Sequence, residues 1–307
     1  MGPPDEALIS VDDAVSSRKE TIASEEETLA SQEETLASEE EPLASEEETV
    51  SSRYDRSRAS DPLRATPDVA LYRRAMSRPC GRHLAALADT IVACRACPRL
   101  VAWRERVASE KVRRFREHDY WGRPVPGFGD PHARLIILGL APGAHGANRT
   151  GRVFTGDRSG DFLYAALHRA GFANQGASSA RDDGLVLRDA FITLAVRCAP
   201  PDNAPQPAEI RRCAPFLDAE LDALPSSRVI LALGAIAWNA AIDRMVRRGA
   251  VAPRPRPRFA HGAELVVPGA PPLLGSYHVS QQNTQTGRLT PAMFDAVLRR
   301  AKTFASA

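Results

Sequence analysis

The sequence predicts an α/β protein with three layers, α/β/α, in which helices cover both faces of a central four-stranded, mostly parallel sheet. Two observations lead to this prediction. Short apolar runs with the composition of buried strands alternate along the chain with longer segments that have helical apolar spacing. The apolar runs are continuous, as expected for strands that are buried on both faces.

Four segments have the character of buried strands. The first, ARLIILGLAP, is a continuous apolar run that ends in Ala-Pro-Gly and therefore leads into a loop. The predicted strands span residues 133–142, 189–198, 228–234 and 273–278. Ligands bind outside the carboxyl ends of the strands in such sheets, so polar motifs that follow these strands are expected to meet in one cleft.

Six further segments have the apolar spacing of helices. The clearest carries both boundary signals, because Ser159-Gly-Asp precedes its apolar stripe and Gly171 ends it. Another begins at Pro207, and proline is favoured in the first turn of a helix. The predicted helices span residues 83–94, 100–108, 159–172, 207–224, 235–246 and 291–304.

Charge divides the chain into an acidic N-terminal part and a basic remainder. The first 52 residues contain 16 acidic and two basic residues, whereas the rest contains 38 basic and 22 acidic residues. A strongly basic body favours a polyanionic partner, of which nucleic acid is the commonest. A soluble surface rich in arginine is the alternative interpretation of the same count.

A seven-residue unit, ASEEETL, repeats with small variations over residues 23–50. A heptad repeat can indicate a coiled coil, but here the apolar seam is thin, like charges crowd together and Pro42 interrupts the pattern. We therefore expect a disordered acidic tail and a linker over residues 1–78. The folded domain is expected over residues 79–307.

The chain lacks the signals of a membrane or secreted protein. No run of about 18 apolar residues is present, so no membrane span is expected. The acidic N-terminus has no apolar segment of the kind found in secretory signals. Five cysteines are too few for a disulfide framework in a chain of 307 residues. We expect a monomeric, cytoplasmic protein, in which clustered cysteines bind metal or do chemistry.

Four of the five cysteines form two pairs that could bind a metal. Cys94 and Cys97 form a CxxC pair, and Cys198 and Cys213 lie at and beyond the end of the second predicted strand. Zn²⁺ and a [4Fe–4S] cluster both use four thiolates, and the spacing separates them poorly. The alternative is that the cysteines act as small buried hydrophobic residues. Prolines beside Cys97 and Cys198 favour rigid ligand loops instead.

A glycine-rich loop follows the first strand and reads GLAPGAHGANRTGRVFTGD over residues 139–157. Its glycines let a ligand approach the backbone closely. Arg149 and Arg152 could contact phosphates, and Phe154 offers a flat face on which a base could stack. A nucleotide-binding hydrolase is the alternative, but the loop has neither a GxxxxGK[ST] nor a GxGxxG pattern.

Two more polar motifs follow strands. The first, TLAVRCAPPDN over residues 193–203, connects the end of the second strand through Cys198 to Asn203. The second, HVSQQNTQTGR over residues 278–288, places a histidine after the fourth strand and then amides and hydroxyls that suit contacts to bases and phosphates. A lone histidine is more often structural, but this setting favours a functional role for His278.

These three motifs resemble the active-site segments of the iron–sulfur uracil-DNA glycosylases, specifically family 5, the type B branch. The resemblance spans about residues 90–303. It implies the uracil-DNA glycosylase fold and the excision of uracil from DNA in base excision repair. Val279 departs from the His-Pro-Ser of related families but leaves His278 and Ser280 in place. The resemblance also implies a [4Fe–4S] cluster on Cys94, Cys97, Cys198 and Cys213.

The resemblance further suggests roles for individual residues. We expect His278 to donate a hydrogen bond to the oxygen of the leaving base, and Phe154 to stack on the flipped base. Asn148 and Asn203 are expected to orient the attacking water. Related branches carry acids or amides near Ala141 and at Leu194, so a pocket with fewer base-reading groups should also accept hypoxanthine. The expected base-binding residues are Gly139, Ala141, Phe154, Leu194 and Ser280.

DNA is the expected partner, in duplex form with a mismatched uracil or as a single strand. The residues expected to contact it are Arg149, Arg152, Gln281, Gln282 and Arg288. The alternative to an enzyme is a metal-stapled nucleic-acid-binding module without catalysis. That alternative explains the basic body and the cysteines, but it does not explain why polar motifs cluster at the strand ends.

Overall fold

The structure, a computed structural model, describes residues 74–251 and 254–306. The acidic repeat and nearly all of the predicted linker therefore lie outside the described residues, and the boundary at residue 79 stays a prediction. Helix α3 (Pro79–Val92) begins at that residue. In the part of the chain that the structure describes, no helix is long and apolar enough to cross a membrane.

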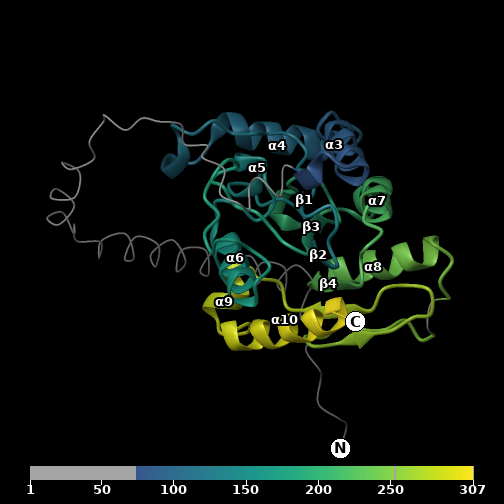
Figure 1. Ribbon diagram of the computed structural model, residues 1–307. Helices are drawn as coiled ribbons and strands as arrows, with labels where there is room; N and C mark the ends of the chain where they lie inside the picture. The colour runs from purple at the N-terminus through teal and green to yellow at the C-terminus, as the bar shows by residue number, and fades with distance from the viewer. Residues whose placement is uncertain (1–73, 252–253, 307) are drawn as a thin grey trace, which may run out of the picture. The chain divides into compact units, whose positions relative to one another are not determined.

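One sheet forms the centre of the described residues (Figure 1). Its strand order is β1-β3-β2-β4-β6-β5, and the four inner strands are parallel as predicted. The prediction missed the antiparallel edge strands β1 and β5, because each has two residues and shows no periodicity. The strands are β1 (Phe128–Gly129), β2 (Leu135–Gly139), β3 (Ala190–Leu194), β4 (Val229–Leu233), β5 (Glu264–Leu265) and β6 (Leu273–Ser276).

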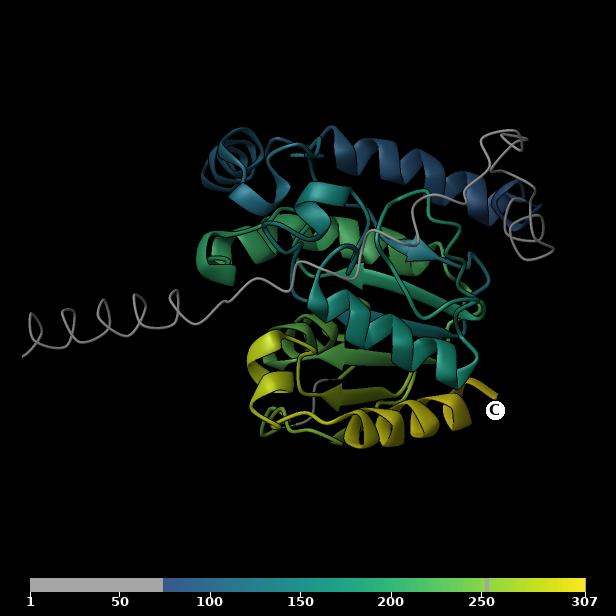
Figure 2. The same cartoon turned by 90° about the vertical axis from the view of Figure 1, so that its left-hand side faces the viewer.

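The register places β2 at the point where the sheet reverses its order. Leu135 of β2 pairs with Ala190 of β3 on one side and with Val229 of β4 on the other. Loops that leave neighbouring strands in opposite directions open a crevice at their carboxyl ends. In Figure 2 the arrows of the parallel strands point toward the side on which α9 (Gln281–Gln285) lies, so the crevice is expected there.

Helices cover both faces of the sheet (Figures 1 and 2). Helices α6 and α10 pack on one face, and α3, α7 and α8 pack on the other. All six predicted helices are present, whereas the short α5, α9, η3 and η4 were not predicted. The remaining helices are α4 (Pro98–Glu110), η3 (Arg113–Phe115), α5 (Ala147–Thr150), α6 (Arg158–Ala170), η4 (Pro201–Asn203), α7 (Pro207–Asp222), α8 (Ala235–Arg247), α9 (Gln281–Gln285) and α10 (Pro291–Ser306).

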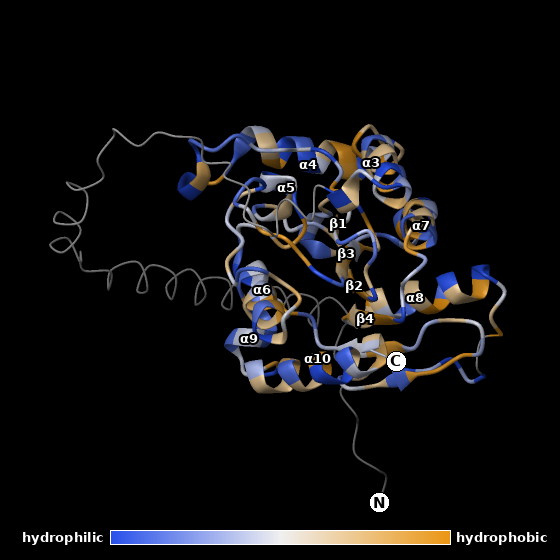
Figure 3. Cartoon of the chain, viewed as in Figure 1, coloured by the Kyte–Doolittle hydropathy of each residue, from blue (hydrophilic) through white to orange (hydrophobic). Residues whose placement is uncertain are grey.

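Alternate residues of each inner strand enter the two halves of the core. In β2, Leu135 and Ile137 lie in the cluster with α6 and α10, while Ile136 and Leu138 lie in the cluster with α7 and α8. Each fully buried side chain of this kind stabilises the fold by about 1.5–3 kcal/mol. Helices α6 and α10 alternate apolar and polar residues along their length, which matches burial of one side (Figure 3). The sheet is therefore a rigid base for the loops at its carboxyl end.

Candidate active site

The loops that follow the parallel strands converge as predicted. Gly139 is the last residue of β2, and a Cβ atom there would lie 2.9 Å from Leu194 Cδ2, at the end of β3, and 2.9 Å from Phe154 Cζ. Gly234 follows β4, and a Cβ atom there would lie 3.5 Å from the Cβ of His278, which comes after β6. The ends of all four parallel strands thus contribute to one site.

Phe154 and His278 are the central pair of this site. Their ring centroids are 6.0 Å apart and the planes are inclined by 36°. Phe154 is 8% exposed and has φ +49°, a left-handed conformation that is unfavourable for a bulky residue. Gly160 permits it, since a Cβ atom at position 160 would lie 1.9 Å from the Phe154 carbonyl oxygen. Strained backbone of this kind persists where the surrounding structure fixes it, and such positions cluster at functional sites.

His278 is held as a neutral imidazole. Burial lowers its pKa to about 4, so the ring has one N–H donor and one acceptor at neutral pH. The backbone is fixed from α9, because Asn283 Nδ2 donates to the His278 carbonyl oxygen at 2.8 Å. A half-buried, neutral donor at the end of a strand can stabilise negative charge that develops on a bound molecule.

Asp157 is a partly buried acid that the sequence analysis did not assign to the site. Its Oδ1 accepts from the Gly160 amide at 2.9 Å, which caps the N-terminus of α6. Burial raises its pKa. Asp157 Oδ2 also lies against the glycine-rich loop, 3.0 Å from where a Cβ of Gly143 would be, and Gly146 packs still more closely on it. The sequence alone accounts for Asp157 as a helix cap, because aspartate is favoured at the N-cap position. Its partial burial under the glycine-rich loop depends on tertiary structure and has no local signal in the sequence.

The four cysteines of the two sequence pairs line one cavity. Cys94 lies in the connection between α3 and α4, Cys97 is the N-cap of α4, Cys198 follows β3, and Cys213 lies on α7. Cys80 lies on α3 and does not line this cavity, as expected. The described residues contain no group of three or more His, Cys, Asp or Glu side chains placed to hold a single metal ion.

Arginine side chains surround the sulfur atoms. Arg104 donates to Cys198 Sγ at 2.8 Å, and the Arg197 amide donates to Cys213 Sγ at 3.3 Å. Burial raises the pKa of Cys213 to about 12. Among the described residues, Arg197 Nε and NH1 and Arg104 Nε are buried without hydrogen-bond partners, although both arginines line the cavity. Buried cations and free N–H donors beside four thiols fit an anionic group bound by thiolates.

A comparison with protein families decides the identity of the fold. The family model described as "Uracil DNA glycosylase superfamily" matches residues 126–302. The chain belongs to the uracil DNA glycosylase superfamily. The match covers the inner strands and all three strand-end motifs, so the predicted family and the α/β/α fold are both confirmed.

Named relatives place the chain beside one branch of this superfamily. It is 55% identical over 220 residues to a type-5 uracil-DNA glycosylase of Thermus thermophilus, an alignment of 72% of this chain and 97% of the relative. A type-5 enzyme of Mycobacterium bovis is 55% identical over 70% of this chain and 79% of the relative. A type-5 enzyme of Pyrobaculum aerophilum is 45% identical over 69% of this chain and 89% of the relative.

Arg149 and Arg152, which were predicted to contact DNA, are both buried in the structure. Arg152 is 4% exposed and its NH2 group lies 2.7 Å from Asp183 Oδ2. Arg149 is 7% exposed and its guanidinium donates to the carbonyl oxygens of His145 and Gly156. Both guanidinium groups are engaged within the protein, where they fix the glycine-rich loop.

The two asparagines expected to orient water lie in different surroundings. Asn148 is fully buried, and its Nδ2 donates to the Arg104 carbonyl oxygen at 3.2 Å. Its Oδ1 is buried without a partner among the described residues and could accept from a water. Asn203 is exposed on η4, with φ +53°. Their roles stay predictions.

The remaining predicted residues divide between the surface and the cysteine centre. Ser280 is the N-cap of α9, and Gln281 and Gln282 are exposed at its start, where they could reach DNA. Arg288 is exposed and lies over the Tyr277 ring at 4.8 Å. Ala141 packs in the small apolar cluster that contains Cys198, so its predicted place in the base pocket has no support from this packing.

Proposed function

We propose that this chain is a DNA repair glycosylase that flips uracil out of DNA and hydrolyses its N-glycosidic bond, leaving an abasic site. The observation that carries the proposal is the pairing of Phe154 with a neutral His278 at the carboxyl end of the sheet. Family membership supports it, as do the relatives named type-5 uracil-DNA glycosylases.

The site supplies two groups that act on the base. A uracil within a duplex is out of reach, so it is extruded at a cost of a few kcal/mol, which is least at a mismatch. Phe154 stacks on the extruded base. The bond between the base nitrogen and the sugar carbon breaks with its electron pair going to the base, and His278 donates to the oxygen that gains this charge. A donor of this kind lowers the barrier by about 3–4 kcal/mol.

Asp157 and the two asparagines are the groups proposed for the sugar side. The positive charge that develops on the sugar would be stabilised by the Asp157 carboxylate beneath the glycine-rich loop. Asn148 and Asn203 would hold water, but an amide cannot deprotonate it. The Asp157 carboxylate can accept the proton as the water adds to the sugar carbon.

The proposed substrate range includes hypoxanthine. Gly139 and Leu194, which meet at the ends of β2 and β3, offer no side-chain amide or acid to read the edge of a base. A wrong base is rejected when it leaves polar groups of the site without hydrogen-bond partners. A site with few such groups therefore discriminates weakly between bases. Other deaminated bases should therefore be released besides uracil.

We also propose that a [4Fe–4S] cluster is bound in the cysteine cavity. Each iron of such a cluster takes one thiolate, so ligands spread around a cavity fit it, and the unpartnered N–H groups of Arg104 and Arg197 would be available to it. When bound, the cluster would crosslink the α3–α4 connection, the loop after β3 and α7. The ligands would be Cys94, Cys97, Cys198 and Cys213.

A reducing compartment suits this centre. All five cysteines are unpaired thiols in the structure, a state typical of proteins in the cytoplasm. We include a cytoplasmic location, a monomeric state and action on duplex DNA with a mismatched uracil in the proposal.

The test uses the purified full chain and labelled oligonucleotides that carry one uracil or one hypoxanthine. Release of the base should leave an alkali-labile site at that position. A brown protein that contains iron and acid-labile sulfide would support the cluster, and zinc in a colourless active protein would overturn it. DNA binding without base release would instead favour the non-catalytic module.

A further inference from the structure

The buried Arg149 anchors a neighbouring surface segment. Its NH1 lies 3.2 Å from His118 Nδ1, and its guanidinium carbon lies 3.9 Å from the centre of the Phe115 ring. The Arg149 carbonyl oxygen accepts from the Trp121 amide at 2.8 Å. Residues 111–123, hereafter the 111–123 segment, are thus fixed against the glycine-rich loop.

More hydrogen bonds tie this segment to the same loop. The Gly122 amide donates to the Asn148 carbonyl oxygen at 3.0 Å, and the Tyr120 hydroxyl lies 3.0 Å from His145 Nδ1. The segment therefore keeps a defined position beside the candidate active site. A DNA strand that delivers a base to this site would pass close to it.

The 111–123 segment carries unpaired positive charge. It contains five basic and two acidic residues, and Arg113, Arg114 and Arg116 are all exposed. None of these three arginines forms an ion pair with the residues that the structure describes. By contrast, arginines on the far helices are neutralised, as in Arg247–Asp218 and Arg300–Glu264.

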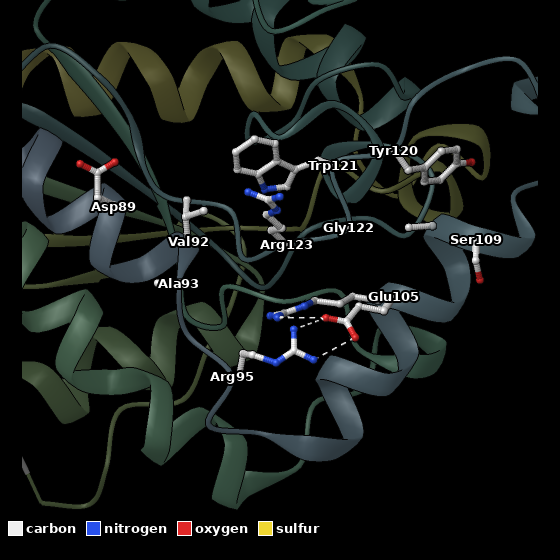
Figure 4. A pocket seen from close by; sticks show the side chains of 12 residues that line it. Asp89, Val92, Ala93, Arg95, Glu105, Ser109, Tyr120, Trp121, Gly122 and Arg123 are labelled. Carbon is white, nitrogen blue, oxygen red and sulfur yellow. Dashed lines mark hydrogen bonds and ion pairs between the residues drawn. The ribbon is translucent and has the colours of Figure 1, made fainter.

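Arginines also lie against the aromatic rings of this segment. Arg123 and Arg181, both exposed, approach the Trp121 ring to 5.7 and 4.5 Å, respectively. Figure 4 shows Arg123 next to this ring, across a cleft from the ion pair of Arg95 and Glu105. Stacking on a fixed ring limits the motion of a guanidinium while its N–H groups stay available to an anion.

We propose that the 111–123 segment, together with Arg181, binds the phosphodiester backbone of the DNA strand beside the flipped nucleotide. The inference rests on the proposed function for the choice of DNA as the polyanion. It adds exposed arginines to the predicted phosphate contacts Arg149 and Arg152, which are buried. Such contacts position the duplex and carry no base specificity of their own.

The experiment measures the salt dependence of DNA binding by fluorescence anisotropy, with an undamaged duplex and the same duplex carrying one uracil. In the triple variant R113Q/R114Q/R116Q, the slope of log affinity against log salt should fall by about 1–3, and affinity at low salt by roughly tenfold or more. Both duplexes should be affected equally. The variant R113K/R114K/R116K should retain the wild-type slope.

The matched control removes three charges elsewhere. Arg228, Arg258 and Arg299 are exposed and form no ion pair with the described residues, and R228Q/R258Q/R299Q should leave the slope unchanged. The inference would be overturned if the slope fell equally in both glutamine variants, or if it did not change in R113Q/R114Q/R116Q. Uracil release by the wild-type chain is measured in parallel. If the wild-type chain releases no uracil, the proposed function is rejected. The comparison of salt slopes still tests the phosphate-binding role of the 111–123 segment separately.

Discussion

Arg104 and Cys198 form a direct contact between helix α4 and the cysteine centre, with NH1 of the arginine 2.8 Å from the sulfur. The same arginine donates through NH2 to the Cys94 carbonyl oxygen at 3.2 Å. Its own carbonyl oxygen accepts from Asn148 of the glycine-rich loop. One buried residue therefore touches two cysteine-bearing loops and the active-site loop.

Replacing Arg104 by methionine should weaken the cysteine centre. The substitution keeps much of the side-chain volume but removes the cation and the N–H donor beside Cys198, both of which favour a bound thiolate. If the proposed cluster is bound, its visible absorbance should be lost faster in the presence of an iron chelator. R106M is the matched control, since Arg106 lies on the same helix but is exposed over Trp103. Equal bleaching in both variants would contradict the role of Arg104.

Replacing His278 by alanine should remove most of the base release while DNA binding persists. The imidazole lies 6.0 Å from the Phe154 ring, and loss of one donor to a developing negative charge lowers kcat about 10²–10³-fold. Single-turnover release of uracil and anisotropy with undamaged DNA measure the two properties. Full activity in H278A would show that another group stabilises the leaving base.

The low pKa of His278 predicts how stability varies with pH. In the unfolded chain the pKa of this group is near its ordinary value of 6.5, whereas in the folded chain its pKa is about 4. The unfolded state therefore binds more protons between these values, and stability is lost as the pH falls through this window. The contribution is about 2 kcal/mol between pH 7 and pH 5.

Urea unfolding of the wild type and of H278N at the two pH values isolates this effect. Burial also lowers the pKa of His145 and His261, so both proteins should lose some stability on acidification. The wild type should lose about 2 kcal/mol more than the variant. Identical losses would mean that His278 is protonated as easily in the folded chain as in the unfolded one.

Much of the fold was predictable because its signals are local and periodic. The strand predicted over residues 228–234 is β4 (Val229–Leu233), and the helix predicted over 159–172 is α6 (Arg158–Ala170), which Gly171 ends with φ +83°. The missed elements are short: β1 and β5 have two residues each, and α5 has four. Tertiary contacts rather than periodicity decide segments of that length.

Site residues could be predicted from the sequence where their position after a strand brings them together. They could not be predicted where the burial of a side chain determines its role. Phe154 and His278 were expected together because both follow strands, and their rings do meet. Arg152 was assigned to DNA by residue type, but its partner Asp183 lies 31 residues further along the chain. Nothing local in the sequence signals such a pairing, and the same is true of the partial burial of Asp157.

Replacing Asp157 by asparagine should separate its charge from its capping role. Asparagine caps a helix about as well as aspartate, so stability should change by less than about 0.5 kcal/mol. If the carboxylate acts on the sugar side, uracil release should fall by about 10²-fold or more. Thermal unfolding and single-turnover release on the same preparation test both expectations. A stable D157N with normal activity would leave Asp157 as a cap alone.

Replacing Glu220 by alanine should destabilise the fold more than removal of an exposed acid. Glu220 is 2% exposed, and its carboxylate accepts from Thr193 Oγ1 at 2.5 Å, Arg197 NH2 at 2.8 Å and the Gly127 amide at 2.8 Å. E220A leaves the Arg197 cation buried without its counter-charge, which costs about 3–5 kcal/mol. D243A removes the half-exposed partner of Arg256 and should cost less than about 1 kcal/mol. Urea unfolding measures both, and because the Arg197 amide also donates to Cys213, E220A should lose the proposed cluster more readily as well.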